Sequence, residues 1–183
     1  MAGSGLWVFG YGSLIWEPGF DFDDRRVATL HGYRRAFCMR SIMYRGTPEA
    51  PGLVLALDRD PGGSCAGLAY HVAEAGAAAT LAYLHERELV SYAYEEARLP
   101  VALAGGETVE ALAYVSNPAH AQYCALSLEA QAEVIARAAG PKGPNADYLM
   151  RTVAGLEALG LHDPELVRLA AMVRSRLGAG TPA

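Results

Sequence analysis

Lysine is almost absent from this chain of 183 residues: Lys142 is the only one, and arginine supplies the rest of the 15 basic side chains. Acidic residues number 20, so the formal net charge is −5. Nucleic acids and anionic membrane surfaces are captured by concentrated positive charge. We therefore expect neither as a partner.

Long apolar runs are also missing, because no stretch of about 18 uncharged apolar residues, the length that crosses a bilayer, is present. The segment Met1–Trp7 has neither the basic start nor the long apolar core of a signal peptide. Cysteine is scarce, and Cys38, Cys65 and Cys124 are widely spaced and odd in number, which is typical of a reducing compartment. These features predict a cytoplasmic protein with no membrane segment.

The motifs of common cofactor sites are absent as well. Gly10-Tyr-Gly12 lacks the third glycine of the dinucleotide fingerprint, and no GxxxxGK[ST] phosphate loop occurs. Gly62–Ala66 fails the GxSxG pattern of a serine nucleophile at its last position. The five histidines show no HxxxH or HExxH spacing, so we expect them to be surface or core residues. The sequence thus predicts no metal, nucleotide or redox cofactor.

Apolar residues are plentiful and make up 52% of the chain, which suits one compact domain of this length. The first half alternates short β-compatible runs with tight-turn signals, the strongest at Asp60–Gly63 and Gly105-Gly106. Strands are predicted over residues 6–9, 27–30, 33–39, 53–57, 66–72, 98–103 and 109–115. So many short strands favour a curved antiparallel sheet or a small barrel.

Helices are predicted over residues 75–89 and through the last third of the chain. That third carries three pairs of start and stop signals, which are Ser127 with Gly140, Asn145 with Gly160, and Asp163-Pro164 with Gly178. In the last helix a core-facing stripe is expected from Leu166, Leu169, Val173 and Leu177.

The predicted fold class is therefore α+β, with a small mixed or antiparallel β-barrel, flanking helices and a helical C-terminal third. A single domain is expected over residues 6–177. Residues 1–5 and 178–183 are expected to be frayed ends.

Two features of the chain point to chemistry. The first is Val8–Trp16, where two glycines flank Tyr11 and would let the backbone approach a ligand and direct amides at an anion or a carbonyl oxygen. The alternative is an ordinary glycine-rich strand end.

The second feature is Glu88. On a helix, Glu88 falls on the same face as Leu81 and Leu84, whereas Glu86 falls on roughly the opposite side. A carboxylate on a core-facing stripe is costly to bury without a partner and is a candidate general base. The alternative is a buried ion pair with one of the arginines.

The segment Val8–Trp16 resembles the opening of the ChaC-type γ-glutamylcyclotransferases. The similarity continues in the same order through four further motifs, which are Tyr44–Gly52, Tyr83–Glu88, Asn117–Tyr123 and Ala139–Leu149. Any one of these motifs is weak, but five in order are specific. They cover roughly residues 6–177, and the family's small β-barrel with flanking helices matches the predicted fold.

The resemblance implies the roles of particular residues. The γ-glutamyl group would be held by Tyr11, Gly12, Ser13, Leu14, Ile15 and Trp16. The family's catalytic glutamate, in its Arg-Glu pair, falls on Glu88, and the tyrosine at Tyr148 is expected to line the same pocket. One departure is that Tyr92 stands where bacterial members usually have glycine, which bears on pocket size and substrate choice.

The resemblance implies an intramolecular reaction on a small-molecule substrate, with no cofactor. The α-amine of a γ-glutamyl group attacks its own γ-carbonyl, and glutathione would give 5-oxoproline and cysteinylglycine. Arg40 and Arg45 are suited to grip the distal carboxylate of glutathione, although surface salt bridging is the alternative for each. Cyclotransfer on other γ-glutamyl amines or amino acids, or a non-catalytic binding module on the same fold, are the other hypotheses.

Overall fold

The computed structural model describes residues 5–179, and the chain divides into two compact units. Among the described residues, one unit is formed by residues 5–36 and 56–121, and the other by residues 37–55 and 122–179. The single domain expected over residues 6–177 stays a prediction. Of the ends expected to fray, residues 1–4 and 180–183 lie outside the described residues, while Gly5 is in a strand and Gly178 in a helix.

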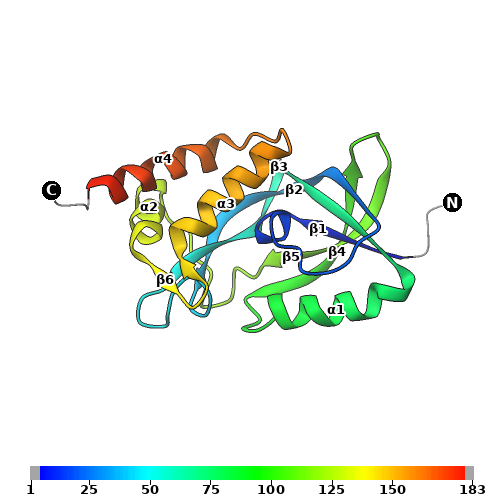
Figure 1. Cartoon of the computed structure of the whole chain (residues 1–183), viewed down its shortest axis with the longest axis horizontal. Coiled ribbons are helices and arrows are strands. Elements are labelled where there is room, and N and C mark those ends of the chain that lie inside the picture. Colours follow the sequence, from blue (N-terminus) through cyan, green and yellow to red (C-terminus); the bar gives the residue numbers. More distant parts are fainter. Residues whose placement is uncertain (1–4, 180–183) are drawn as a thin grey trace. The chain divides into compact units, whose positions relative to one another are not determined.

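A closed β-barrel in the order β1-β3-β2-β4-β5 confirms the predicted fold class (Figure 1). The elements are β1 (Gly5–Gly10), η1 (Ser13–Ile15), β2 (Asp24–Ser41), β3 (Gly52–Ala73), α1 (Glu74–Glu88), β4 (Tyr94–Leu103) and β5 (Thr108–Ser116). Strand β1 pairs antiparallel with β3 and parallel with β5, so Val8 lies opposite both Tyr70 and Leu112 and is fully buried. Val8 and Phe9 point to opposite faces of the strand and are both buried, which explains why β1 is an almost continuous apolar run.

The hairpin between β4 and β5 forms where the glycine pair predicts it. Gly105 and Gly106 have φ of +121° and +94°, a region that glycine enters without steric cost. The other predicted breaks are wrong, because β2 continues through Gly32 and β3 continues through Asp60–Gly63. Neither Gly62 nor Gly63 has positive φ, so the two-residue turn that needs it does not form there.

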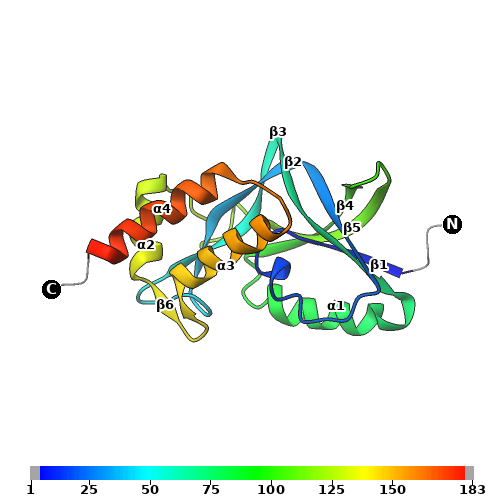
Figure 2. The same cartoon turned by 45° about the horizontal axis from the view of Figure 1, so that its top comes forward.

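Three helices belong to the other unit, namely α2 (Leu128–Arg137), α3 (Asn145–Ala158) and α4 (Pro164–Ala179), with the short strands β6 (Ala139–Gly140) and β7 (Gly143–Pro144). Helix α4 packs against both α2 and α3 (Figure 2). Ser127 and Asp163 cap their helices as predicted, through bonds from Ala130 N at 3.2 Å and Leu166 N at 3.1 Å.

Two details of these helices differ from the sequence-based expectation. Leu177 is 46% exposed, so the buried stripe of α4 ends at Val173. Asn145 does not cap α3: its Oδ1 accepts from Leu53 N and its Nδ2 donates to Leu53 O, both at 2.7 Å. The side chain thus acts as a one-residue extension of the hydrogen-bonding pattern at the start of β3.

No helix among residues 5–179 is both long enough and apolar enough to cross a membrane.

Replacing Asn145 with alanine removes both bonds and leaves the buried N–H and C=O of Leu53 without these partners. Because each of the two unsatisfied buried groups costs about 1–3 kcal/mol, we expect the free energy of unfolding to fall by roughly 2–6 kcal/mol. Urea denaturation measures this loss. Asn117→Ala is the control, because Asn117 makes an exposed bond to Ala119 N. If both variants lost the same small amount of stability, the two bonds of Asn145 to Leu53 would not have the structural role assigned to them.

Candidate active site

The loop after β1 is fixed by three hydrogen bonds to strands of the barrel. The Tyr11 hydroxyl donates to the backbone oxygen of Tyr114 at 2.7 Å, and Arg35 Nε donates to the backbone oxygen of Tyr11 at 2.6 Å. The Tyr70 hydroxyl donates to the backbone oxygen of Leu14 at 2.7 Å. Three separate strands therefore hold a segment that has no regular strand partner of its own.

This loop presents backbone N–H groups in a short 3₁₀ turn. Ile15 N donates to Gly12 O at 3.0 Å and Trp16 N donates to Ser13 O at 3.2 Å. Within residues 5–179, the N–H groups of Gly12, Ser13 and Leu14 have no protein acceptor. Successive unsatisfied N–H groups can bind a carboxylate or the oxygen of a polarised carbonyl.

Glu88 is the last residue of α1, and its side chain is 18% exposed, whereas Glu86 is exposed. Leu84 and Thr80, one and two turns earlier, are the buried residues of this helix. The helix-face prediction thus separated the two glutamates correctly. The alternative interpretation also holds, because Glu88 Oε1 lies 3.2 Å from Arg87 Nε in an ion pair.

Arg87 is the residue that sequence reasoning left without a role. Its Nη2 donates to Ser13 Oγ at 2.7 Å, and its Nη1 donates to Glu17 O at 2.7 Å and to Tyr83 Oη at 2.9 Å. With Nε directed at Glu88, one guanidinium joins the 3₁₀ loop to the end of α1. Its side chain is only 11% exposed. The only sequence signal was its position next to Glu88.

Two phenols in this unit have perturbed acidity. Burial raises the pKa of Tyr70 to about 12, although Arg25 and Arg87 oppose the shift. Burial also raises the pKa of Tyr114, and the negative charges of Glu96 and Glu88 add to the effect. Both side chains therefore remain neutral hydroxyl donors at neutral pH.

Arg45 and Tyr148 form a second group, in the other unit. Arg45 is 6% exposed, its Nη1 donates to Pro144 O at 3.2 Å, and its guanidinium lies 5.8 Å from the centre of the Tyr148 ring. The Tyr148 hydroxyl accepts from Leu55 N at 3.2 Å. A Cβ on Gly52 would lie 2.2 Å from Arg45 O, so only glycine permits this packing. These contacts immobilise Arg45.

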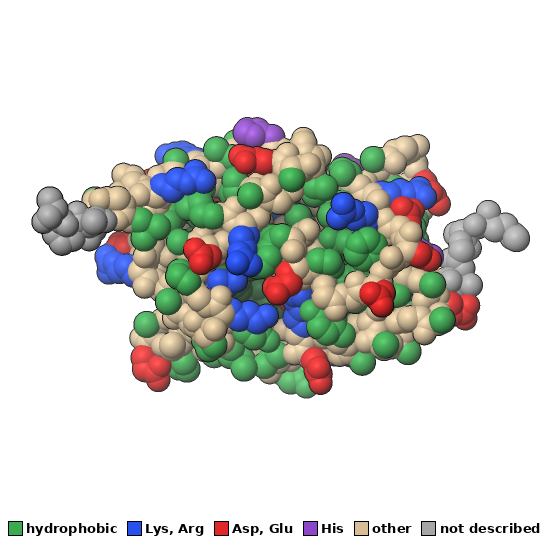
Figure 3. Space-filling model, in the orientation of Figure 1, with side chains coloured by type: hydrophobic (Ala, Val, Ile, Leu, Met, Phe, Trp, Pro, Cys, Tyr) green, Lys and Arg blue, Asp and Glu red, His purple; other side chains and the backbone are tan. Residues whose placement is uncertain are grey.

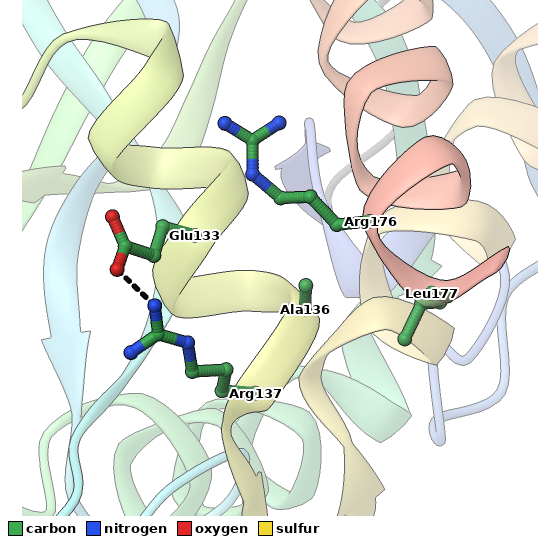
Figure 4. Close-up of a pocket in the computed structure, with 5 residues that line it drawn as sticks. All are labelled: Glu133, Ala136, Arg137, Arg176 and Leu177. Carbon is green, nitrogen blue, oxygen red and sulfur yellow. Dashed lines mark hydrogen bonds and ion pairs between the residues drawn. The ribbon is translucent and has the colours of Figure 1, made fainter. Parts of the chain in front are cut away.

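Basic and acidic side chains are interspersed on the face shown in Figure 3. No group of three or more metal-ligating side chains occurs among the described residues. A groove of about 480 Å³ is lined by Glu133, Ala136 and Arg137 of α2 and by Arg176 and Leu177 of α4 (Figure 4). None of the predicted site residues lines it.

Tyr92, the departure from the expected glycine, has φ of +55° and is the one non-glycine residue with positive φ in the described part of the chain. This conformation suits glycine because it brings a Cβ close to the following carbonyl oxygen. The residue is 74% exposed, so its ring does not fill a buried pocket of the unit that contains α1.

Comparison with known proteins agrees with the geometry. The profile of a family described as ChaC-like protein matches residues 6–176. A glutathione-specific γ-glutamylcyclotransferase of Escherichia coli K12 is 36% identical over 97% of this chain and 76% of its own length. The human glutathione-specific γ-glutamylcyclotransferase 1 is 36% identical over 85% of this chain and 71% of its own. A yeast γ-glutamyl cyclotransferase specific to glutathione superposes with a TM-score of 0.86 at 25% identity, covering 94% of this chain and 96% of its own.

The backbone at Tyr92 gives a test of its strain. Tyr92→Gly and Tyr92→Ala both remove an exposed ring, but only glycine relieves the left-handed conformation. We expect the glycine variant to be more stable than the alanine variant by about 1 kcal/mol, the lower end of the cost of this conformation. Denaturant midpoints measure the difference, and a more stable alanine variant would contradict a positive φ at this position.

Proposed function

Because the chain belongs to the ChaC-like family, we propose that it is a glutathione-specific γ-glutamylcyclotransferase that degrades glutathione to 5-oxoproline and cysteinylglycine. The observation that carries the proposal is the guanidinium of Arg87, which contacts both Ser13 in the Tyr11–Trp16 loop and Glu88. A binding loop and a carboxylate are thereby held within one rigid group, as the reaction requires.

The Tyr11–Trp16 loop is proposed to fold the γ-glutamyl chain so that its α-amine meets its own γ-carbonyl. Holding such groups in an attack geometry is worth ~7–11 kcal/mol in well-oriented intramolecular reactions. The loop suits this task because Arg35 and Tyr70 hold its backbone and the Tyr11 hydroxyl is anchored on the backbone oxygen of Tyr114. The N–H groups of Gly12 and Ser13 are proposed to stabilise the oxyanion that forms.

Glu88 is proposed as the group that takes a proton from the α-ammonium and returns it to the leaving nitrogen. The reference pKa of a peptide amine is ~8, so the amine must lose a proton before it attacks. Arg87 fixes the position of the Glu88 carboxylate from one side. The reaction moves protons and one acyl group only, and the mechanism therefore assigns no step to a metal or redox cofactor.

Arg45 and Tyr148 are proposed as substrate-binding residues, with Arg45 directed to the distal carboxylate of glutathione. The buried, fixed guanidinium supports this role, because a pre-organised fork loses little entropy when it binds a carboxylate. A cytoplasmic location is proposed from the same substrate, since reduced thiols persist in reducing compartments.

Glu88→Gln should keep the fold, because the two side chains are nearly isosteric, and should lower kcat by ~10²–10⁴-fold, the usual contribution of a proton-transfer group. Formation of 5-oxoproline, followed by mass, measures the rate. Glu86→Gln is the matched control on the exposed side of α1 and should keep full activity. An active Glu88→Gln enzyme would reject this role.

A substrate comparison tests the whole proposal. Purified protein is incubated with glutathione, γ-glutamyl-alanine and a simple γ-glutamyl amine, and both 5-oxoproline and the released amine are identified by mass. We expect the highest kcat/KM with glutathione, because it alone of the three presents both a cysteinyl group and a glycine carboxylate. If the simple γ-glutamyl amine is turned over as well as glutathione or better, glutathione is not the preferred substrate. If none of the three compounds yields 5-oxoproline, the proposed cyclotransfer is wrong.

A further inference from the structure

Three hydrogen-bonding side chains form a line near Glu88, one each from α1, β4 and β5. Tyr114 Oη lies 3.5 Å from Glu96 Oε2, and the same Glu96 oxygen lies 2.5 Å from His85 Nε2. His85 precedes Glu88 by one helical turn. The proposed reaction has so far assigned no role to any of the three.

Along this line the side chains change from buried to half-exposed. Tyr114 is 2% exposed, while the side chains of Glu96 and His85 are 31% and 45% exposed. The charged groups whose field reaches the Tyr114 phenol are Glu96 on β4 and Glu88 on α1. Tyr114 is also tied to the binding loop, since its backbone oxygen accepts from the Tyr11 hydroxyl.

The proton balance of the proposed reaction requires more than one transfer. The α-ammonium starts with three protons, and the lactam nitrogen of 5-oxoproline keeps one. As the bond between the glutamyl carbonyl carbon Cδ and Nα forms and the Cδ–N bond to cysteine breaks, the leaving nitrogen gains two protons and becomes an ammonium. A single carboxylate such as Glu88 carries one proton at a time, so a second route would speed turnover.

We propose that Tyr114, Glu96 and His85 form a proton relay that connects the Glu88 region with solvent. This inference rests on the proposed function. A proton arriving at the Tyr114 hydroxyl oxygen displaces the phenolic proton to Glu96, and Glu96 passes one to His85, which exchanges with water. The leaving nitrogen gains its two protons from two sources, one returned by Glu88 and one taken from solvent, which replaces the proton sent out along the relay.

The chemistry of Tyr114 suits a relay that passes protons in a concerted way. Burial, Glu96 and Glu88 all raise the pKa of the Tyr114 phenol, so a free phenolate is strongly disfavoured. A concerted exchange never forms that phenolate, because the hydroxyl accepts one proton as it donates another. Glu96, which meets both Tyr114 and His85 through one oxygen, is the link that the route cannot bypass.

His85→Asn and Glu96→Gln test the relay, with glutathione as substrate and 5-oxoproline as readout. We expect kcat to fall about tenfold in each, below the ~10²-fold minimum of a direct proton-transfer group, with KM unchanged. Added imidazole should restore the His85→Asn rate, because it can replace the half-exposed ring, and should not restore Glu96→Gln. The double variant should be no slower than Glu96→Gln alone.

His71→Asn is the matched control. His71 Nδ1 also lies 2.5 Å from a carboxylate, Asp23 Oδ1, on the same unit, but it has no bond to Glu96 or Tyr114. Its kcat should equal that of the wild type with or without imidazole. Urea midpoints of all variants identify any loss of rate that comes from unfolding.

Full kcat in either relay variant, or a loss in His85→Asn that imidazole does not restore, would overturn the relay. If the wild-type protein forms 5-oxoproline and the relay variants keep its kcat, the relay is rejected but the proposed function stands. If the wild-type protein forms no 5-oxoproline, the proposed function fails and the relay fails with it.

Discussion

The guanidinium of Arg87 is the contact on which the arrangement of the proposed active-site residues depends. It meets the Ser13 hydroxyl, the Tyr83 hydroxyl, the backbone oxygen of Glu17 and the carboxylate of Glu88, all within 3.2 Å. Arginine suits this position because its planar fork donates in several fixed directions at once, whereas lysine offers a single point charge. The helix end and the loop therefore adopt one mutual geometry.

The segment after the loop is shaped by the same contact. The backbone oxygens of Glu17 and Pro18 both accept from Arg87, and the chain then turns at Gly19 with φ of +75°. A Cβ there would lie 2.1 Å from the Tyr83 hydroxyl, which itself accepts from Arg87. Gly19 is thus required by Arg87 and Tyr83 together, although nothing in its immediate sequence indicates this.

The sequence predicted what local chemistry determines. Helical periodicity placed Glu88 and Glu86 on different faces, and Ser127 and Asp163 cap their helices through bonds to residues only three positions away. Sequence-based prediction failed where the role of a side chain depends on a partner far away in the sequence. Asn145 looks like a cap but bonds to Leu53, 92 residues away, and Arg87 gains its role from Ser13, 74 residues away. No local pattern encodes such pairings, and the motif resemblance named Glu88 without explaining how it is held.

The proposed intramolecular cyclisation would benefit from this rigidity. The flexible γ-glutamyl chain has to lose conformational freedom before its amine can attack, and a mobile loop would have to be ordered at the same time. Here the loop is already ordered by three hydrogen bonds to different strands of a closed barrel. The Tyr11 hydroxyl donates to the backbone oxygen of Tyr114, and the side chains of Arg35 and Tyr70 donate to backbone oxygens of the loop. A closed barrel has no free edge along which these strands can slip, so the distances that the chemistry needs are set by the fold itself.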